Sequence, residues 1–150
     1  MSKFTSPADR LIIAADFKPE QLDNKDWVQG KVLNLARTLQ GTGVCLKMNS
    51  ALRACGYDLG RRVRSFGLKI FADLKLYDIG ETLATDARLL RGMGADLLTV
   101  SCVAGADGIK VLVNELPETE VLGVTVLTSF NDAQSRTAFG QPVYEAALQL

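Results

Sequence analysis

The sequence predicts an α/β protein, a (β/α)8 TIM barrel of which this chain covers about the first five β/α units. Short and almost continuously apolar runs recur along the 150 residues, as they do in parallel strands that are buried on both faces. Between these runs, apolar residues are spaced three or four positions apart, which places them on one face of a helix. Alternating strands and helices of this length build a parallel sheet with right-handed crossovers, either closed into a barrel or open and doubly wound.

The expected strands are five apolar runs, residues 11–15, 44–46, 68–72, 97–100 and 121–127. The expected helices follow from four apolar stripes, which consist of Val28, Val32, Leu35 and Leu39; of Leu52, Cys55, Leu59, Val63 and Phe66; of Leu83, Ala87 and Leu90; and of Ile109, Leu112, Val113 and Leu116. Ser50 fits the N-cap of the second helix and Gly67 its end, while Gly94 fits the end of the third. Asn131 and Asp132 fit the cap of a fifth helix.

The residues after the first apolar run favour the closed barrel over the open sheet. The chain there reads Asp16-Phe17-Lys18-Pro19 and has no G-x-G-x-x-G fingerprint of a dinucleotide-binding sheet. Eight β/α units need roughly 200 to 250 residues. We therefore expect residues 1–150 to be a single domain that forms the N-terminal part of a longer, apparently truncated barrel.

The charge balance argues against a nucleic-acid partner, and the length of the apolar runs argues against a membrane partner. The chain carries 17 Lys+Arg against 17 Asp+Glu, and its longest basic run is the pair Arg61-Arg62, whereas duplex binders need a basic stripe. No run approaches the roughly 20 apolar residues that span a bilayer, and residues 1–7 carry no signal-peptide run. We expect a cytoplasmic protein whose three cysteines are free thiols.

The absence of histidine restricts the possible chemistry most strongly. It excludes Ser-His-Asp triads, H-E-x-x-H zinc sites and a histidine general base. Any reaction must therefore use carboxylates, lysines, hydroxyls or backbone groups.

Charged residues stand at the carboxyl ends of three expected strands, where barrel enzymes place their reacting groups. Asp16 ends the first strand, Lys47 the second, and Asp73, Lys75 and Asp78 follow the third. Asp73 and Lys75 are two positions apart and therefore point to the same face of a strand. Alternating opposite charges make their partial burial tolerable. These residues indicate either an active site or a structural ion network.

Hydroxyl groups follow the fifth apolar run, in Thr125-Val126-Leu127-Thr128-Ser129-Phe130. The Ser129 hydroxyl could hydrogen-bond a polar ring or a carbonyl group of a ligand. Alternatively, Thr125 fills a β-branched strand position and Ser129 caps the helix that follows.

With these residues the sequence resembles the orotidine 5′-phosphate decarboxylase family. The resemblance rests on Asp16, on Leu46-Lys47-Met48, on the stretch from Asp73 to Thr82 that reads D-L-K-L-Y-D-I-G-E-T, on Leu97-Leu98-Thr99-Val100 and on Val124-Thr125-Val126-Leu127-Thr128-Ser129. The stretch D-x-K-x-x-D-I-G-x-T is the most specific of them. These segments occur in order over nearly the whole chain.

The resemblance implies a cofactor-free decarboxylation of orotidine 5′-monophosphate (OMP) to UMP, with no metal. It makes Lys75 the general acid that protonates ring carbon six, and it places Asp73 against the departing carboxylate. Lys47 belongs to the same Lys-Asp-Lys-Asp array, whose last member is Asp78. Lys47 and Asp16 would contact the ribose, although Asp16 could instead orient Lys47.

The resemblance also implies a homodimer with shared active sites. Asp78, Ile79 and Thr82 would match residues donated to the partner's site, and Ser129 would bond the pyrimidine. Three places depart from the usual pattern. Tyr77 stands where histidine is common, Glu81 stands where asparagine is usual, and Ser101-Cys102-Val103-Ala104-Gly105 follows the fourth strand where histidine-alanine is common.

The family's phosphate-binding loops follow strands seven and eight, and this chain stops at Leu150. Because remote phosphate contacts supply much of such an enzyme's transition-state binding, we expect the chain alone to be feeble or inert.

Two alternatives remain open. The chain is also similar to 3-keto-L-gulonate 6-phosphate decarboxylase and hexulose-phosphate synthase, which share the barrel and the D-x-K-x-x-D motif but use magnesium and have glutamate where Lys47 stands. The Lys47 ammonium would repel that metal. The second alternative is a non-catalytic partial barrel that acts as a folding unit or interaction partner, with exposed strand edges and apolar interior.

Overall fold

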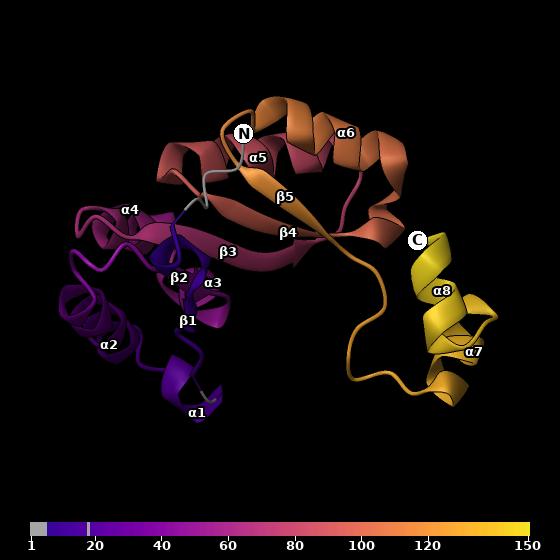
Figure 1. Cartoon of the computed structure of the whole chain (residues 1–150), viewed down its shortest axis with the longest axis horizontal. Coiled ribbons are helices and arrows are strands. Elements are labelled where there is room, and N and C mark those ends of the chain that lie inside the picture. Colours follow the sequence, from indigo (N-terminus) through magenta and orange to yellow (C-terminus); the bar gives the residue numbers. More distant parts are fainter. Residues whose placement is uncertain (1–5, 18) are drawn as a thin grey trace.

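A parallel sheet of five strands forms the centre of the computed structural model, which describes residues 6–17 and 19–150 (Figure 1). Residues 1–5, where no signal-peptide run was expected, and Lys18 lie outside the described residues. The strands are β1 (Ile12–Ala14), β2 (Cys45–Met48), β3 (Lys69–Leu76), β4 (Leu97–Ser101) and β5 (Glu120–Val124). They lie in the order β1-β2-β3-β4-β5. An open doubly wound sheet reverses its strand order at a switch point, so this order is that of a barrel wall.

Helices follow the strands in alternation, as the apolar stripes predict. They are α1 (Pro19–Leu22), α2 (Lys25–Thr38), α3 (Ser50–Cys55), α4 (Tyr57–Arg64), α5 (Gly80–Met93), α6 (Gly105–Glu115), α7 (Asp132–Phe139) and α8 (Val143–Gln149), with 3-10 turns at Ala8–Arg10 and Cys102–Ala104. Helices α5 and α6 lie against one face of β3, β4 and β5 (Figure 1). The pair α7 and α8 stands apart at the end of a long loop that follows β5 (Figure 1). None of the helices in 6–17 and 19–150 combines the length and apolarity needed to cross a membrane.

The sheet residues alternate between two environments, as the period of a strand requires. Leu46, Met48, Ile70 and Leu98 are fully buried and belong to the large core between sheet and helices. Residues of the opposite parity face the inner side, where Cys45, Phe71 and Leu97 form a separate small apolar cluster. Lys47, Asp73 and Thr99 are next on this inner face, two positions further along β2, β3 and β4. The apolar layer therefore lies below a polar layer at the carboxyl ends of the strands.

The second expected helix is interrupted. Its stripe from Leu52 to Val63 is buried, but α3 ends at Cys55 and α4 begins at Tyr57. Gly56 between them has φ +78° and ψ 175°, a combination that is open to glycine and interrupts a right-handed helix. The expected N-cap also shifts by one residue, since Ser50 is the first residue of α3 and Asn49 precedes it. Helix α4 ends at Arg64, before the expected stop at Gly67.

The later elements follow the prediction with two differences. Gly94 ends α5 in the left-handed conformation, and Asn131 caps α7 by accepting a hydrogen bond from the Gln134 amide. Strand β5 ends at Val124 and not at Leu127, because its neighbour β4 ends at Ser101, the partner of Val124. In α6 Leu112 is buried, whereas Val113 of the same expected stripe is exposed.

Candidate functional site

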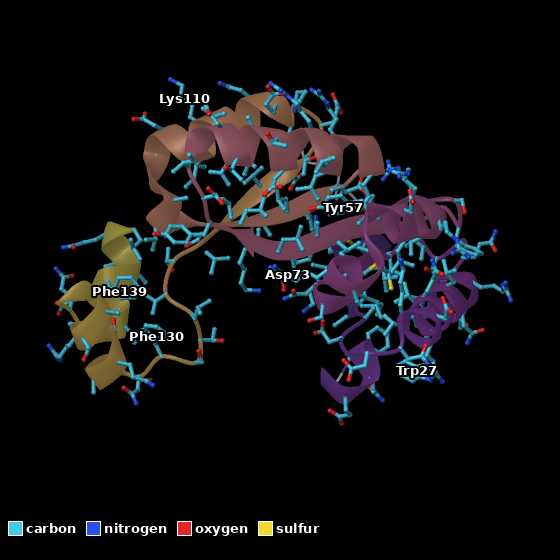
Figure 2. All side chains as sticks on the ribbon, turned by 180° about the vertical axis from the view of Figure 1, so that it is seen from behind. Trp27, Tyr57, Asp73, Lys110, Phe130 and Phe139 are labelled. Carbon is cyan, nitrogen blue, oxygen red and sulfur yellow. The ribbon has the colours of Figure 1, made fainter. Side chains whose placement is uncertain are left out.

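Asp73 and Lys75 lie on the inner face of β3, which extends past the expected apolar run to Leu76. The Asp73 residue is 8% exposed, and its side chain faces the concave side of the sheet (Figure 2). The Lys75 ammonium lies 2.7 Å from Asp73 Oδ1. Side chains two positions apart lie on the same face of a strand, and this spacing brings the Asp73 carboxylate and the Lys75 ammonium together, as expected from the sequence.

Lys47 joins this pair to the first strand. Its ammonium donates a hydrogen bond of 2.9 Å to Asp16 Oδ2 and lies 3.5 Å from Asp73 Oδ2. Asp16, Lys47, Asp73 and Lys75 thus form one line of alternating charges across β1, β2 and β3, which we call the charged array. Asp16 is its outer end, with a side chain that is 56% exposed.

The pKa shifts of Lys47 and Asp73 favour their ionised forms. The hydrogen bond to Asp16 raises the pKa of Lys47 above its ordinary value, although burial opposes this rise. Burial acts to raise the pKa of Asp73, but hydrogen bonds from Lys75 and Thr99 and the charges of Lys75 and Lys47 outweigh it. The pKa of Asp73 therefore lies below its ordinary value.

Thr99 of β4 completes the surroundings of Asp73, and the sequence does not single it out. Its hydroxyl donates to Asp73 Oδ1 at 2.9 Å and accepts from the Lys75 amide at 2.9 Å. Lys75 has φ +48°, a conformation that costs a non-glycine residue about 1–2 kcal/mol. In the sequence, Thr99 looks like one β-branched residue of a buried strand. Only its parity with Leu97 and Ser101 places it on the inner face.

A cavity of about 230 Å³ opens beside Lys75. Its lining combines apolar walls with the Lys75 ammonium and three hydroxyl side chains, and consists of Lys75, Tyr77, Ser101, Val103, Val124, Thr125, Leu127, Phe130 and Phe139. The rings of Phe130 and Phe139 have centroids 5.9 Å apart, and Figure 2 shows both on the segment that faces the concave side of the sheet. A flat, partly polar ring of a ligand would fit such a mixed lining. Ser129 is exposed in the same loop and does not line this cavity.

Asp78, Ile79 and Thr82 lie outside the charged array. Asp78 and Ile79 form the turn between β3 and α5, where the Ile79 amide donates to Asp78 Oδ1 at 2.8 Å, and Thr82 lies in the first turn of α5. All three are exposed. A second cavity, of about 450 Å³, is lined by Tyr77, Asp78, Ile79, Val103 and Ala104.

The inner face therefore offers a set of groups suited to charged, partly apolar ligands. A fixed ammonium at Lys75 can stabilise a developing anion or donate a proton to it. A carboxylate at Asp73 can disfavour a second negative charge beside it. The adjacent cavity can hold a ring against the ammonium.

Solved structures that resemble this chain support the barrel architecture inferred from the strand order. An uncharacterized conserved protein from Geobacillus kaustophilus matches 92% of this chain and 65% of its own with a TM-score of 0.76 at 24% identity. Orotidine 5′-phosphate decarboxylase from Lactobacillus acidophilus matches 93% of this chain and 63% of its own, with a TM-score of 0.72 and 27% identity. The chain is a partial (β/α)8 barrel with a charged array at the carboxyl ends of its strands.

Comparison with protein families then gives the family itself. Residues 9–149 match the orotidine 5′-phosphate decarboxylase / HUMPS family, and the chain belongs to this family. The orotidine 5′-phosphate decarboxylase of Methylobacterium radiotolerans is 34% identical over 147 residues, which are 97% of this chain and 60% of that protein. The enzyme of the same name from Thermobifida fusca is 45% identical over 64 residues, which are 43% of this chain and 28% of that protein. The chain thus spans about 60% of the length of the first of these relatives.

Proposed function

We propose that this chain forms the first five β/α units of an orotidine 5′-phosphate decarboxylase, as a single domain that acts without a metal or cofactor. The observation that carries the proposal is the charged array. Its two ammonium groups and two carboxylates alternate from Asp16 to Lys75, and ion-pair distances of 2.9, 3.5 and 2.7 Å join them. Four charges aligned along one rim are costly to desolvate, and a reaction that creates a carbanion gives a reason to hold them there.

Lys75 is the proposed general acid. When carbon dioxide leaves ring carbon six of OMP, the bonding electron pair stays on that carbon as a vinyl carbanion. The Lys75 ammonium stabilises this anion and then gives it a proton, and the neutral amine regains a proton from solvent. Such a group accelerates the reaction because it interacts more strongly with the carbanion than with the substrate.

Asp73 is proposed to lie against the substrate carboxylate. Its lowered pKa keeps it negative at neutral pH. A fixed negative charge beside a second carboxylate raises the energy of the bound reactant, and this repulsion disappears when carbon dioxide leaves. Lys47 and Asp16 are proposed to contact the ribose, and their 2.9 Å hydrogen bond sets the position of the Lys47 ammonium.

The cavity beside Lys75 is the proposed place of the pyrimidine ring. Phe130 and Phe139 would pack against the ring, and Ser129 would have to turn inward from its exposed loop to bond it. The substrate phosphate would bind to groups supplied by the remaining part of the barrel.

The exposed residues after β3 support a proposed homodimer. Asp78, Ile79 and Thr82 serve no group of the charged array in their own chain, and we propose that each reaches the site of a second copy.

Magnesium-dependent sugar-phosphate chemistry is less well supported. A magnesium site needs carboxylate oxygens that are free to bind the ion. In this chain the Lys47 ammonium occupies the space between Asp16 and Asp73 and pairs with both.

The proposal is tested by the ultraviolet absorbance of OMP, with the chain alone and with the chain joined to the remaining β/α units of the M. radiotolerans relative. We expect turnover in the joined protein without added metal, and a loss of about 10³-fold or more in Lys75→Ala. Binding of a substrate analogue should weaken only modestly, because the ammonium acts mainly on the carbanion. Lys110→Ala is the matched control, since Lys110 is an exposed lysine on α6 (Figure 2).

Two results would contradict the proposal. The first is a folded joined protein that leaves OMP unchanged, and the second is a Lys75→Ala variant with near-normal turnover. Turnover of 3-keto-L-gulonate 6-phosphate that requires magnesium would favour the alternative activity.

A further inference from the structure

Thr99 lies at an irregularity in the sheet, directly beside the two central residues of the charged array. It is 5% exposed. The pairing of β3 with β4 runs from Phe71 opposite Leu97 and Ala72 opposite Leu98 to Leu76 opposite Val100. Residues 73–75 of β3 therefore face the single β4 residue Thr99. Such a bulge interrupts the hydrogen-bond ladder and redirects the side chains it carries.

The Thr99 side chain replaces the missing ladder partner of Lys75. A backbone amide can only donate, so the Lys75 amide donates to Thr99 Oγ1 over 2.9 Å. Thr99 has a single hydroxyl proton, and Asp73 Oδ1 lies 2.9 Å away as an acceptor. The direction of both hydrogen bonds is thus determined by the chemistry of the groups.

These contacts close a ring. Asp73 Oδ1 accepts both from Thr99 and from the Lys75 ammonium, the latter at 2.7 Å. The Lys75 amide is held by the same hydroxyl, and Lys75 has the left-handed φ of +48°. One hydroxyl therefore restrains the carboxylate of Asp73 and the backbone from which the Lys75 ammonium projects.

We propose that Thr99 is a positioning residue, whose hydroxyl holds the bulge of β3 and so fixes the relative placement of Asp73 and Lys75. Its effect on the structure is independent of the activity, and only its effect on turnover rests on the proposed function. The hydrogen bond that Thr99 donates to Asp73 also contributes to the lowered pKa of that carboxyl group.

The first test uses nuclear magnetic resonance of the 150-residue chain and needs no substrate. It measures hydrogen exchange of the Lys75 amide and titration of the Asp73 carboxyl carbon. In Thr99→Val we expect exchange at Lys75 to become about tenfold faster, because one hydrogen bond is lost, and the pKa of Asp73 to rise. In Thr99→Ser, which keeps the hydroxyl, both values should stay near those of the unmodified chain.

Thr119→Val is the matched control. Thr119 lies just before β5 and donates to the Ala95 carbonyl at 2.8 Å, so its loss removes a comparable hydrogen bond elsewhere. The control should leave Lys75 exchange and the Asp73 pKa unchanged. Unchanged values in Thr99→Val, or equal changes in Thr119→Val, would overturn the proposal.

The unmodified chain gives an independent check if Thr99→Val does not fold. A Lys75 amide that exchanges as slowly as its paired neighbours in β3 supports the proposal, and one that exchanges as fast as in an unfolded peptide refutes it.

The second test measures kinetics in the joined protein. Thr99→Val should lower kcat about 10- to 100-fold, since small misplacement of reacting groups is costly, while KM changes less and Thr99→Ser restores turnover. In Thr99→Val, the acid limb of the pH dependence of kcat should move to higher pH, because the pKa of Asp73 rises. Absence of turnover in every protein would contradict the proposed function and leave the magnetic resonance result as the test of Thr99. Normal turnover in Thr99→Val would refute the positioning role alone.

Discussion

Asp73 is the residue on which the charged array converges. Lys75 contacts its Oδ1 and Lys47 its Oδ2, at 2.7 and 3.5 Å, and the Thr99 hydroxyl also bonds Oδ1. Its side chain is only 11% exposed, so solvent screens these interactions weakly. Removing its charge would leave two ammonium groups close to one another without the carboxylate between them.

Asp73→Asn should therefore change both stability and its dependence on pH. The pKa of Asp73 is lowered in the folded chain, so its ionised form adds stability above the unfolded pKa of about 3.9. This stability is lost as the pH falls through the folded value. At pH 7 we expect Asp73→Asn to lose about 1–3 kcal/mol, and the difference from the unmodified chain should shrink below pH 4.

Urea unfolding at pH 7, 4 and 3 measures this effect. Asp58→Asn is the control, because Asp58 forms an exposed ion pair with Arg61 on α4 and such pairs contribute little. If the free energies of unfolding of Asp73→Asn and of the unmodified chain differ by the same amount at all three pH values, the folded chain does not stabilise the ionised form of Asp73.

Among the helices, the break at Gly56 determines how α3 and α4 cover the sheet. The apolar stripe continues through the break, with Leu52 and Cys55 buried before it and Leu59 and Val63 buried after it. One continuous helix with this stripe would have a single axis, whereas α3 and α4 can have different axes. The positive φ of Gly56 lets the chain turn while both halves keep their apolar faces on the core.

Gly56→Ala should destabilise the chain by about 1–3 kcal/mol, because a Cβ atom disfavours the combination of φ +78° and ψ 175° even though nothing lies within 4 Å of its position. Gly30→Ala is the matched control, since Gly30 lies within α2 in equally open surroundings. There alanine should add about 0.5–1 kcal/mol through its higher helix propensity. Thermal unfolding compares the two, and equal shifts of Tm would contradict the conformational explanation.

The local pattern of the sequence is sufficient to predict most of the elements. The strands and helices follow from periodicity, and the proximity of Asp73 to Lys75 follows from the period of a strand. The break at Gly56 could not be predicted, because the apolar spacing is the same on both sides of it. The end of β5 depends on where its neighbour β4 ends.

The role of Thr99 depends on a register shift between two strands, and this shift is a non-local property. The sequence shows a threonine among apolar residues, but it does not show that three residues of β3 face it. Features that arise from pairing between distant segments are therefore the ones that sequence reasoning misses.

At the scale of the whole molecule, the sheet is one wall of a barrel with an apolar surface beside its site. Within the described ranges 6–17 and 19–150, no further strand pairs with the outer edges of β1 and β5. Tyr77 and Ile79 are 66% and 71% exposed and line the 450 Å³ cavity together with Asp78. Large exposed side chains of this kind are typical of an interface. Because Tyr77 also lines the cavity beside Lys75, this surface is continuous with the proposed site.

If a second copy covers this surface and donates Asp78, two inactive variants should restore activity when combined. In the joined protein, Lys75→Ala and Asp78→Ala should each be nearly inactive. In a mixed dimer one site has lost both groups, while the other combines an intact Lys75 with an intact Asp78. Random exchange of equal amounts should therefore restore about a quarter of the unmodified activity, given two-fold symmetry.

Mixing Lys75→Ala with Asp73→Asn is the control. Each site takes both Lys75 and Asp73 from the same chain, so every site in the mixed dimer lacks one of them and no intact site can form. Activity that stays at the level of the separate variants after subunit exchange would show that Asp78 does not act in the site of a partner.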